Sequence, residues 1–333
     1  MQKILDPCAL ARQTPTSHQA GPAQARRLRD ELTRFARLAT RGELPLRLAS
    51  PAGALVAGGR GHFHLGAELF LQIAGHTDFT FPNGQLHLTA GQALLVPPKV
   101  LHDERVGPDA PDAPDGPAPQ QAFGNIVVYA EAGRLTCHLA HEARPGLPGI
   151  LHLEGRHHAQ VGHIQDWLAE AARLGPEPGV DSVWAAAQAG ALVCAALAGV
   201  LRALDEPAGP HGAQPAEPAL LARARLLIQN QLGDHTLGVR GLAEQCGCSA
   251  DHLSSLFSRH AGEHLAGHIT RLRMARAARL LAESTLSGKE IAWACGYAGP
   301  SYFIRTFREH HGCTPQAWRA AAGQPTEALK APP

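Results

Sequence analysis

The hydrophobic residues of this chain follow a helical period near both ends of the sequence and a strand-like pattern in between. Within residues 23–40, apolar side chains recur every three or four positions and arginines occupy the other faces, which predicts an amphipathic helix. Its apolar positions are Leu28, Leu32, Phe35 and Leu38. Between residues 46 and 153 the apolar runs are short and are separated by Gly and Pro, which predicts β-strands. The clearest strands are 67–74, 84–88, 93–96, 125–129 and 135–139.

Two further helical stretches, residues 159–174 and 181–204, follow the predicted strands. The second has an apolar stripe formed by Val193, Leu197, Val200 and Leu204. We predict that the two helices form a dimerisation segment, residues 156–205, with this stripe at the dimer interface. The alanine-rich part of the second helix is only weakly hydrophobic and is interrupted by Gln188, so a bundle or dimer helix is favoured over a membrane span.

The last third of the chain is predicted to be helical from residue 219 to residue 322, because it carries several helix-start signals. Ser287 and Glu290 have the spacing of a capping box. The other signals are a capping serine and two prolines at first helical positions, namely Ser249, Pro300 and Pro315. Residues 265–283 show an uninterrupted helical pattern, which would be roughly 28 Å long.

Changes of pattern along the chain predict the domain boundaries. A helical extension covers residues 1–43, and the β-rich region covers residues 44–155. Three segments are expected to be irregular. They are a mobile loop at residues 107–120, a linker with 4 prolines at residues 206–218 and a disordered tail at residues 323–333.

Residues 243–265 and 292–315 are two versions of one sequence motif. Each reads Ala-x-x-Cys-Gly, followed by an apolar pair at i and i+4 and then by Gly. The apolar pairs are Leu253 with Phe257 and Phe303 with Phe307. A helix, a glycine-containing turn and a second helix with such a pair make the helix-turn-helix pattern. Two copies in one basic stretch predict a protein that reads double-stranded DNA.

Charge is distributed unevenly along the chain. The formal net charge is +1, yet residues 218–322 contain 12 Lys and Arg against 7 Asp and Glu, a net charge of +5. The other residues therefore sum to −4. A basic C-terminal region on an acidic body favours nucleic-acid binding at one end and another role at the other end.

The cysteines and the N-terminal sequence indicate a cytoplasmic protein. The 7 cysteines are scattered and none forms a Cys-x-x-Cys pair, so we expect reduced thiols. Residues 1–40 contain arginine-rich turns and no apolar core of a signal peptide. The sequence also lacks a Gly-rich phosphate loop, a nucleophile elbow and paired catalytic carboxylates, so no catalytic residue is predicted.

The doubled motif resembles the DNA-binding domain of the AraC/XylS family of bacterial transcription regulators, in which a long helix joins two helix-turn-helix units. The most specific family signature begins here with Lys289-Glu-Ile-Ala-Trp-Ala-Cys-Gly-Tyr and continues to Arg319. The resemblance covers the C-terminal third of the chain. It implies a regulator that binds double-stranded DNA specifically and responds to a small-molecule effector. The other implied partners are a second copy of the chain and RNA polymerase, with no role for a membrane.

Each predicted recognition helix has a core side and a solvent side. The core side is expected to consist of Leu253, Leu256, Phe257, Phe303 and Phe307. The solvent side is expected to contact DNA through Asp251, Ser254, Ser255, Arg259, Ser301, Tyr302, Arg305 and Arg308. Arg305 is the best candidate for reading a base, because arginine can donate two hydrogen bonds to guanine. Arg259 and Arg308 are better suited to phosphates.

The first helix-turn-helix unit departs from the family pattern. Glu263-His264-Leu265 replaces the usual Gly-x-Ser/Thr-Pro turn, and the recognition helix has few long hydrogen-bond donors. We therefore expect base readout by this unit to be weak or of unusual specificity.

A second constellation of polar residues lies in the β-rich region and consists of His62, His64, Glu68 and His102. Two histidines separated by one residue on a strand point to the same face, so the four side chains can converge. Their spacing resembles the two motifs of cupins, which are small antiparallel barrels, and also the sensing domain of many AraC-type regulators. The resemblance implies an effector pocket lined by these four residues. Lys99 and Val106 depart from the second motif, where cupin enzymes have Gly and Asn.

Two interpretations of this constellation remain open. Three imidazoles and one carboxylate suit a divalent first-row metal ion, and the same groups suit the polar lining of an effector pocket. A cofactor is not expected to be required. The alternative to a regulator is a metal-dependent enzyme of cupin type, similar to a dioxygenase, with an added DNA-binding domain. The predicted fold class is α+β multidomain, with a cupin-like barrel, a helical segment and an all-α double helix-turn-helix.

Overall fold

The computed structural model describes residues 22–50, 61–107, 123–131, 133–144, 147–175, 182–206 and 218–322. Within these residues the chain forms two compact units, which divide after Ala222 and which we call the N-terminal unit and the C-terminal unit. Most of the loop, linker and tail predicted at residues 107–120, 206–218 and 323–333 lies outside the described residues.

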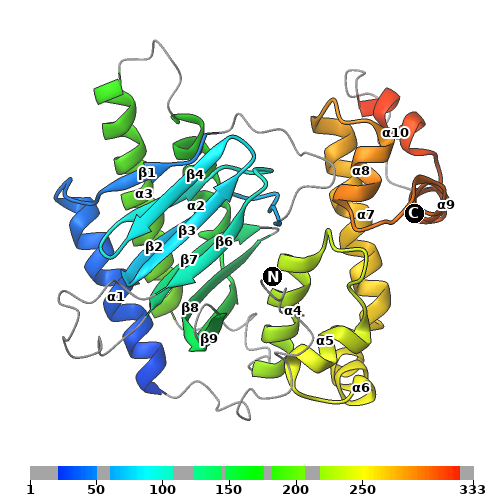
Figure 1. Ribbon diagram of the computed structural model, residues 1–333, viewed down its shortest axis with the longest axis horizontal. Helices are drawn as coiled ribbons and strands as arrows, with labels where there is room; N and C mark the ends of the chain where they lie inside the picture. The colour runs from blue at the N-terminus through cyan, green and yellow to red at the C-terminus, as the bar shows by residue number, and fades with distance from the viewer. Residues whose placement is uncertain are drawn as a thin grey trace, which may run out of the picture. The chain divides into compact units, whose positions relative to one another are not determined.

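The described part of the N-terminal unit contains two β-sheets (Figure 1). The larger sheet has the strand order β1-β5-β2-β7-β8-β9, in which β1 is parallel to β5 and the other pairs are antiparallel. The smaller sheet is antiparallel and has the order β4-β3-β6. The strands are β1 Leu46–Leu48, β2 Glu68–Ala74, β3 His76–Phe81, β4 Gly84–Thr89, β5 Ala93–Val96, β6 Asp103–Gly107, β7 Gly124–Glu131, β8 Arg134–Arg144 and β9 Leu147–His157.

The five strands predicted from the sequence correspond to β2, β4, β5, β7 and β8 and are confirmed. The strands β1, β3, β6 and β9 were not predicted. In β3 the polar His76 and Asp78 face outward and only Thr77 and Phe79 are buried, so the apolar signal is short. The sequence of β9 contains one Pro and two Gly, and its pairing with β8 shifts register twice, which weakens the strand pattern.

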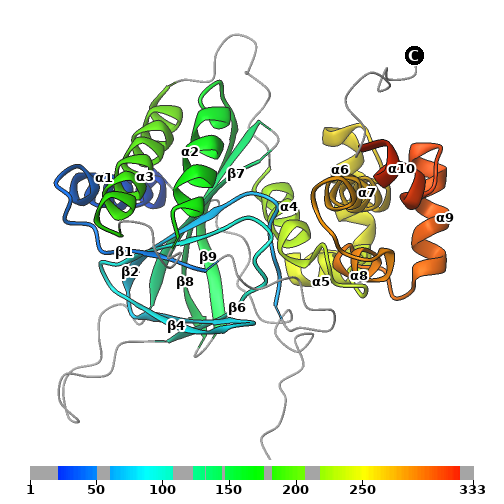
Figure 2. The ribbon, with the colours of Figure 1, turned by 90° about the horizontal axis from the view of Figure 1, so that it is seen from above.

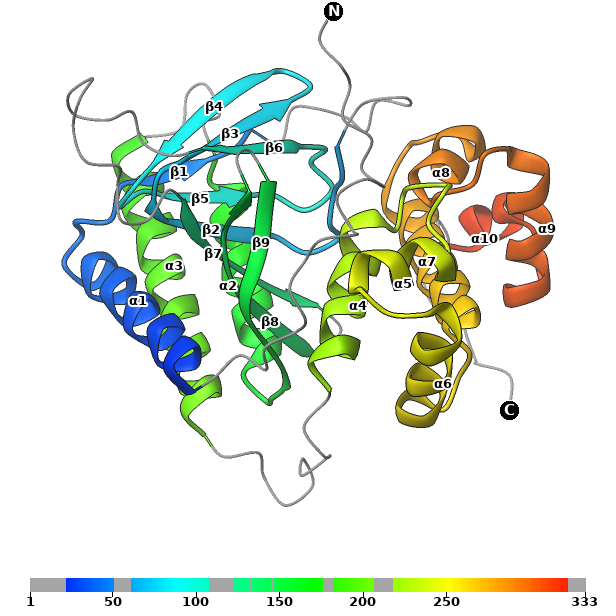
Figure 3. The same ribbon diagram turned by 60° about the horizontal axis from the view of Figure 1, so that its bottom comes forward.

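Three helices cover one face of the larger sheet, and the smaller sheet lies over the other face (Figures 2 and 3). The helices are α1 Pro22–Thr40, α2 Val161–Arg173 and α3 Ser182–Asp205. Alternate residues of β2 and β7 pack against these helices, namely Leu69, Leu71, Ile126 and Val128. Because successive side chains of a strand alternate between faces, the residues between them point toward the smaller sheet. Glu68 is one of these interior residues.

The apolar stripe of α3 is buried inside the N-terminal unit. Val193, Leu197 and Val200 are 0% exposed and Leu204 is 2% exposed. All four belong to the core that α3 shares with α1, α2 and the larger sheet. The prediction that this stripe forms a dimer interface is therefore wrong. The physical reason is that the apolar face of the sheet must itself be covered, and helical periodicity shows that a face is buried without showing what buries it.

The helix α1 is part of the same core, because Leu28, Leu32 and Phe35 are buried in it. It is a layer of the N-terminal unit and does not form a separate extension. By length and composition alone, one helix among the described residues is suited to cross a membrane, residues 183–205, with a mean hydropathy of 1.8. A single such helix is weak evidence for a membrane span, and in α3 the apolar stripe packs within the protein.

The C-terminal unit is entirely helical in its described residues. Its long helix α7, Leu265–Glu283, connects α5 and α6 on one side with α8, α9 and α10 on the other (Figure 1). The other helices are α4 Ala219–Gln231, α5 Val239–Cys246, α6 Ala250–Ala261, α8 Gly288–Ala294, α9 Pro300–His311 and α10 Pro315–Ala322. The range predicted for the connecting helix, 265–283, is confirmed.

The predicted helix starts in the C-terminal unit are also confirmed. The Ser249 hydroxyl accepts a hydrogen bond from the backbone N–H of His252 at the start of α6. Ser287 and Glu290 form the capping box of α8. Pro300 and Pro315 are the first residues of α9 and α10. In the recognition helices four residues are buried as predicted, namely Leu253, Phe257, Phe303 and Phe307. Leu256 is only half-buried.

Candidate nucleic-acid interface and effector site

The helix α9 has one side in the core and one side in solvent. Phe303 and Phe307 are 0% exposed and hold the helix on its unit. The four residues predicted to contact DNA are all exposed, namely Ser301, Tyr302, Arg305 and Arg308. Ile304, which was not among the predicted contacts, is 45% exposed beside them. An apolar side chain at such a position can contact a thymine methyl group.

Arg305 is held along the surface of α9 without being buried. Its guanidinium carbon lies 5.1 Å from the centre of the Tyr302 ring, and its Nε lies 4.0 Å from Glu309 Oε1. The side chain is 67% exposed, so the ion pair is weak and solvent-screened. The geometry therefore presents a guanidinium group on the exposed face, restrained by an aromatic ring and available to an incoming ligand.

Other arginines of the C-terminal unit are engaged in contacts within the unit. Arg273 donates hydrogen bonds to the carbonyl oxygens of Leu232 and Asp234, at 3.1 and 2.6 Å. Arg319 donates to the carbonyl oxygen of Leu281 at 3.2 Å. The net charge of this region therefore overstates the charge that faces solvent. Counting charges in the sequence could not separate the anchoring arginines from the exposed ones.

The helix α6 presents a smaller set of polar groups. Asp251, Ser255 and Arg259 are exposed, and Ser254 is half-buried. Arg259 Nε donates to the carbonyl oxygen of Ser255 at 3.3 Å. Arg259 is the one long cationic side chain among these four residues, and it lies near the C-terminal end of the helix. This arrangement suits a phosphate contact better than base readout.

The turn after α6 is stabilised by a network that the usual family turn would not contain. The Glu263 carboxylate accepts a hydrogen bond from Arg271 Nη2 at 2.8 Å, and it lies 2.6 Å from His268 Nδ1. The bond from Arg271 lowers the pKa of Glu263 to about 2, against the opposing effect of burial. Leu265 is 1% exposed at the first position of α7, and Pro315 is likewise buried at the start of α10. Leu265 thus takes the buried apolar position at the start of α7 that Pro315 takes at the start of α10.

The structure brings His62, His64, Glu68 and His102 together, as the sequence predicts, and adds Glu104. We call these five residues the interior cluster. His62 and His102 form a two-way backbone bridge at 2.9 Å, and Glu68 and Glu104 belong to β2 and β6. His64, Glu68 and His102 are almost fully buried. Glu104 follows His102 by two residues, so the alternation of side chains along a strand predicts that both point to the same face.

Two backbone features hold the interior cluster in place. Gly61 has a φ of 108°, and a Cβ atom there would lie 2.2 Å from the carbonyl oxygen of His102. The position therefore requires glycine. Lys99 has a φ of 66°, and its N–H donates to the carbonyl oxygen of His64 at 2.7 Å. Lys99 thus adopts the left-handed conformation that glycine adopts most easily. The turn therefore forms although Lys99 stands where cupin enzymes have Gly.

The side-chain atoms of the interior cluster form a continuous series of close contacts. Glu68 Oε1 lies 3.3 Å from His64 Nε2, and Glu68 Oε2 lies 3.3 Å from His102 Nε2. Glu104 Oε1 lies 3.6 Å from His102 Nε2 and 3.8 Å from His62 Nε2. Three imidazoles and two carboxylates are therefore linked in one cluster.

The protonation of His102 is controlled by its two acidic neighbours. Burial alone would lower the pKa of His102, but the carboxylates of Glu104 and Glu68 outweigh this effect and raise the pKa to about 10. Burial raises the pKa of Glu68, and His102 opposes that rise. His102 Nδ1 donates to the carbonyl oxygen of Val100 at 3.0 Å. The raised pKa favours the imidazolium form of His102, in which Nε2 would carry a second proton beside the carboxylates.

The donor set of the interior cluster fits a divalent cation. Glu68 Oε2 and His102 Nε2 are buried, and neither atom makes a hydrogen bond with a described residue although they are close. A cation would be held by His62, His64 and Glu68 or by His62, His102 and Glu104, the two sets whose ligand atoms lie within 4.8 Å of one another, and in the second set it would replace the Nε2 proton of His102. The hydrogen bond from His102 Nδ1 to a backbone carbonyl already orients the ring in the way that metal-bound histidines require.

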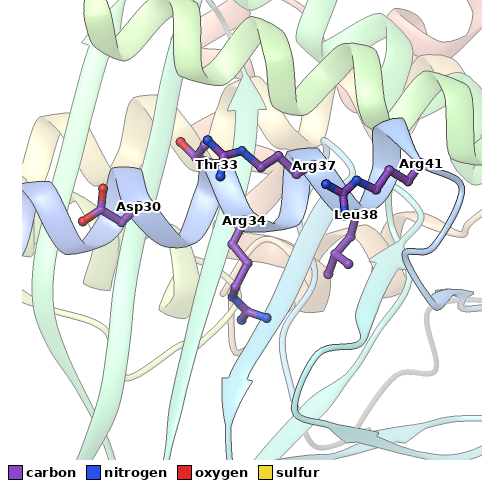
Figure 4. Close-up of a pocket in the computed structure, with 6 residues that line it drawn as sticks. All are labelled: Asp30, Thr33, Arg34, Arg37, Leu38 and Arg41. Carbon is purple, nitrogen blue, oxygen red and sulfur yellow. The ribbon is translucent and has the colours of Figure 1, made fainter.

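A shallow pocket of about 410 Å³ lies along α1, apart from the interior cluster (Figure 4). It is lined by Asp30, Thr33, Arg34, Arg37, Leu38 and Arg41. The arginine side chains do not converge on one point, because Arg34 points away from Arg37 and Arg41. Arg34 is also paired with Glu31 at 2.7 Å. The pocket therefore lacks the arrangement of a specific binding site.

Two known protein families match separate parts of the chain. Residues 58–112 match the family described as the AraC-like ligand binding domain, and this range contains the whole interior cluster. Residues 242–321 match the family described as a helix-turn-helix domain, which contains both recognition helices. The two matches therefore cover separate regions of the chain, one containing the interior cluster and one containing α6 and α9.

Known proteins are similar to parts of the chain over limited lengths. The HTH-type transcriptional regulator GlxA of Rhizobium meliloti (strain 1021) is 35% identical over 130 residues, which are 36% of this chain and 39% of GlxA. The uncharacterised HTH-type transcriptional regulator YpdC of Escherichia coli (strain K12) is 37% identical over 70 residues, which are 21% of this chain and 25% of YpdC. A solved AraC-type regulator from Chromobacterium violaceum is 30% identical, covers 34% of this chain and 98% of its own, and gives a TM-score of 0.30. The matched segments thus span less than half the length of the curated relatives.

Proposed function

We propose that the chain is an AraC-type transcription regulator, which controls transcription by binding a specific double-stranded DNA site under the control of a small-molecule effector. The observation that carries the proposal is the exposed face of α9, where Ser301, Arg305 and Arg308 project from a helix whose other side is locked in the core. The alternative of a cupin-type enzyme has no support, because the matched relatives are regulators.

The proposal assigns a role to each part of the chain. Residues 44–155 sense the effector, with α1 as a covering layer, and residues 219–322 bind DNA through α6 and α9. A regulator of this kind acts in the cytoplasm and meets RNA polymerase at a promoter. An effector can act only by binding more tightly to one arrangement of the domains than to another.

We propose that dimerisation uses the exposed face of α3 and not its buried stripe. Val183 and Trp184, at the start of α3, are 70% and 72% exposed. Ala187, Ala191 and Ala198 continue an exposed apolar face along the same helix. Two large apolar side chains next to a row of alanines suit close packing against a second copy of α3.

We expect the fragment of residues 218–322 to bind double-stranded DNA on its own with strongly salt-dependent affinity. If about five phosphates are contacted, the affinity should fall roughly 100- to 1000-fold between 50 and 200 mM salt. Fluorescence anisotropy with a labelled duplex measures this dependence. Arg308→Ala should reduce the slope of the plot of log affinity against log salt by about one, because it removes one phosphate contact.

Circular dichroism of the fragment supplies the control for this experiment. A fragment with the helical content of α4 to α10 that shows no binding at low salt would contradict a DNA-binding function. Glu290→Gln, which keeps a side chain suited to the capping box of α8 and removes no cationic group, should leave the salt dependence unchanged.

We propose that the interior cluster is the centre of the effector site. His62, His64, Glu68 and His102 supply polar contacts, and Glu104 adds a second carboxylate. The same groups are suited to bind a divalent cation, either as the effector or beside it. A polar effector would meet a protonated His102 as a hydrogen-bond donor, whereas a cation bound by His102 would have to displace its Nε2 proton.

The metal-free protein should lose stability as the pH rises from 7 to 10. The pKa of His102 is raised in the folded protein to about 10, above the ~6.5 of an unfolded histidine. Its protonation therefore stabilises the folded state fully below pH ~6.5, and this contribution is lost as the pH rises through about 10. We expect the Tm to fall by roughly 5 °C or more over this range, measured by differential scanning fluorimetry after treatment with EDTA.

Two variants and the addition of Zn²⁺ test whether His102 causes this pH dependence of the Tm. His102→Gln should flatten the profile between pH 7 and 10, whereas His157→Gln, an exposed histidine on β9, should leave it as in the wild type. Saturating Zn²⁺ should also flatten the profile and raise the Tm, because the ion replaces the Nε2 proton. A metal-free wild type whose Tm is constant across this range would contradict the coupling of His102 to the two carboxylates.

A further inference from the structure

We propose that the smaller sheet carries a second metal site on its outer face, formed by His76, Asp78 and His87, for a divalent first-row transition metal ion such as Zn²⁺. We call these three residues the outer triad. Neither the DNA-binding function nor the effector site requires it, so it stands or falls independently of the proposed function.

The topology of the smaller sheet places the outer triad on one face. Asp78 on β3 is directly opposite His87 on β4 in the antiparallel register. His76 precedes Asp78 by two residues, so it points to the same side of β3. Thr77 and Phe79, which alternate with them, are 0% exposed and face the interior of the unit. The three polar side chains therefore converge on the solvent side.

The distances within the outer triad are close to those of a bound ion. His87 Nδ1 lies 2.6 Å from Asp78 Oδ1, and His76 Nε2 lies 3.7 Å from Asp78 Oδ2. The centres of the two imidazole rings are 4.9 Å apart. Ligand atoms at about 2.1 Å from a tetrahedral ion are roughly 3.4 Å from one another, a value between the two measured distances. Small side-chain rotations therefore suffice to form the site.

The position of His76 depends on a glycine in the neighbouring strand. His76 pairs with Gly107 of β6, and a Cβ atom on Gly107 would lie 2.7 Å from His76 Cε1 and 2.8 Å from Nε2. The absence of a side chain at Gly107 thus makes room for the imidazole beside Asp78. A pair of His87 and Asp78 alone would need no such space.

The ligand chemistry indicates the class of ion. Two imidazoles and one carboxylate favour Zn²⁺, Ni²⁺ or Cu²⁺ over Mg²⁺ or Ca²⁺, which prefer oxygen ligands. Asp78 and His87 have side chains that are 48% and 57% exposed, so water can complete the coordination. An ion here would link β3 to β4 by side chains in addition to their backbone hydrogen bonds.

The outer triad is separate from the interior cluster, although both involve the smaller sheet. The buried ring of Phe79 lies on the interior side of β3, with its centre 6.3 Å from the His102 ring. The outer triad occupies the opposite side of the same strand. Binding at the two places can therefore be distinguished by variants on each side.

Metal titration of the full chain without a histidine tag tests the proposal. After treatment with EDTA, the wild type should bind at least one equivalent of Zn²⁺ with saturation, measured by isothermal titration calorimetry. His76→Gln and His87→Gln should each bind one equivalent of Zn²⁺ less, or should bind that equivalent with an affinity at least about 10-fold lower, because each variant loses an imidazole ligand. With Co²⁺, the visible absorption of a low-coordinate site should appear in the wild type and should decrease in both variants.

Arg105→Gln is the matched control, because Arg105 lies opposite Asp78 on β6 and on the same face, but is not a ligand. It should keep the full stoichiometry and the Co²⁺ spectrum. His87 and Arg105 are exposed and His76 is half-buried, and circular dichroism checks that each variant is folded. Zn²⁺ binding with wild-type stoichiometry and affinity in either His76→Gln or His87→Gln would overturn the proposal.

Discussion

Replacing Leu197 with aspartate should unfold the N-terminal unit. Leu197 is 0% exposed in the core formed by α1, α2, α3 and the larger sheet. Loss of the leucine contacts removes ~2–5 kcal/mol, and burial of an unpaired carboxylate adds several kcal/mol. Together these effects approach the ~5–15 kcal/mol by which a typical domain is stable. We expect loss of the cooperative thermal transition of this unit and aggregation, measured by circular dichroism and light scattering.

Trp184→Asp is the matched control on the same helix. Trp184 is 72% exposed, so a carboxylate at this position stays in water and the Tm should change little. If α3 dimerises through its exposed face, this variant should be a folded monomer by analytical ultracentrifugation. A folded, monomeric Leu197→Asp protein would restore the stripe as a dimer interface. A folded dimer for Trp184→Asp would move the interface away from the start of α3.

The contrast between Leu197 and Trp184 shows what sequence periodicity can establish. The stripe of α3 was recognised from its spacing, and its burial is observed. The identity of its packing partner depends on the larger sheet, whose strands come from residues 46–157. No local pattern reports which distant surface will cover an apolar face. The assignment of the stripe to a dimer interface was wrong for this reason.

Helix boundaries in the C-terminal unit could be predicted because local chemistry fixes them. The hydroxyl groups of Ser249 and Ser287 satisfy backbone N–H groups at helix starts, and Pro300 has no N–H to satisfy. Strands lack such local signals and depend on their neighbours. The strand β3 was missed because its outer face carries His76 and Asp78, which do not follow the apolar pattern.

The two polar clusters differ in how far the sequence reveals them. In the interior cluster, His62, His64 and Glu68 are near one another in sequence, and motif spacing linked them to His102. Glu104 could have been added from the alternation of strand residues. The outer triad depends on the register between β3 and β4, which places Asp78 opposite His87. Because β3 carries only a short apolar pattern, the sequence does not reveal that Asp78 and His87 pair across two strands.

Arg305→Ala should weaken binding to the cognate DNA site more than binding to a scrambled duplex. Arg305 is 67% exposed on α9, on the side opposite the buried Phe303 and Phe307, and Tyr302 restrains its guanidinium group. Two hydrogen bonds to one guanine would contribute ~1–3 kcal/mol of discrimination, which corresponds to a loss of roughly 5- to 150-fold in affinity for the cognate site. Preference should relax at one base position.

Arg308→Ala provides the comparison, because it removes a charge from the same exposed side of α9 near its C-terminal end. A phosphate contact positions the protein without reading sequence, so this variant should weaken cognate and scrambled DNA equally. The two variants are separated by measuring both duplexes at one fixed salt concentration, since affinity depends steeply on salt. Equal losses on both duplexes for Arg305→Ala would make Arg305 a backbone contact. Specificity would then have to come from Ser301, Tyr302 or Ile304 on α9, or from the helix α6.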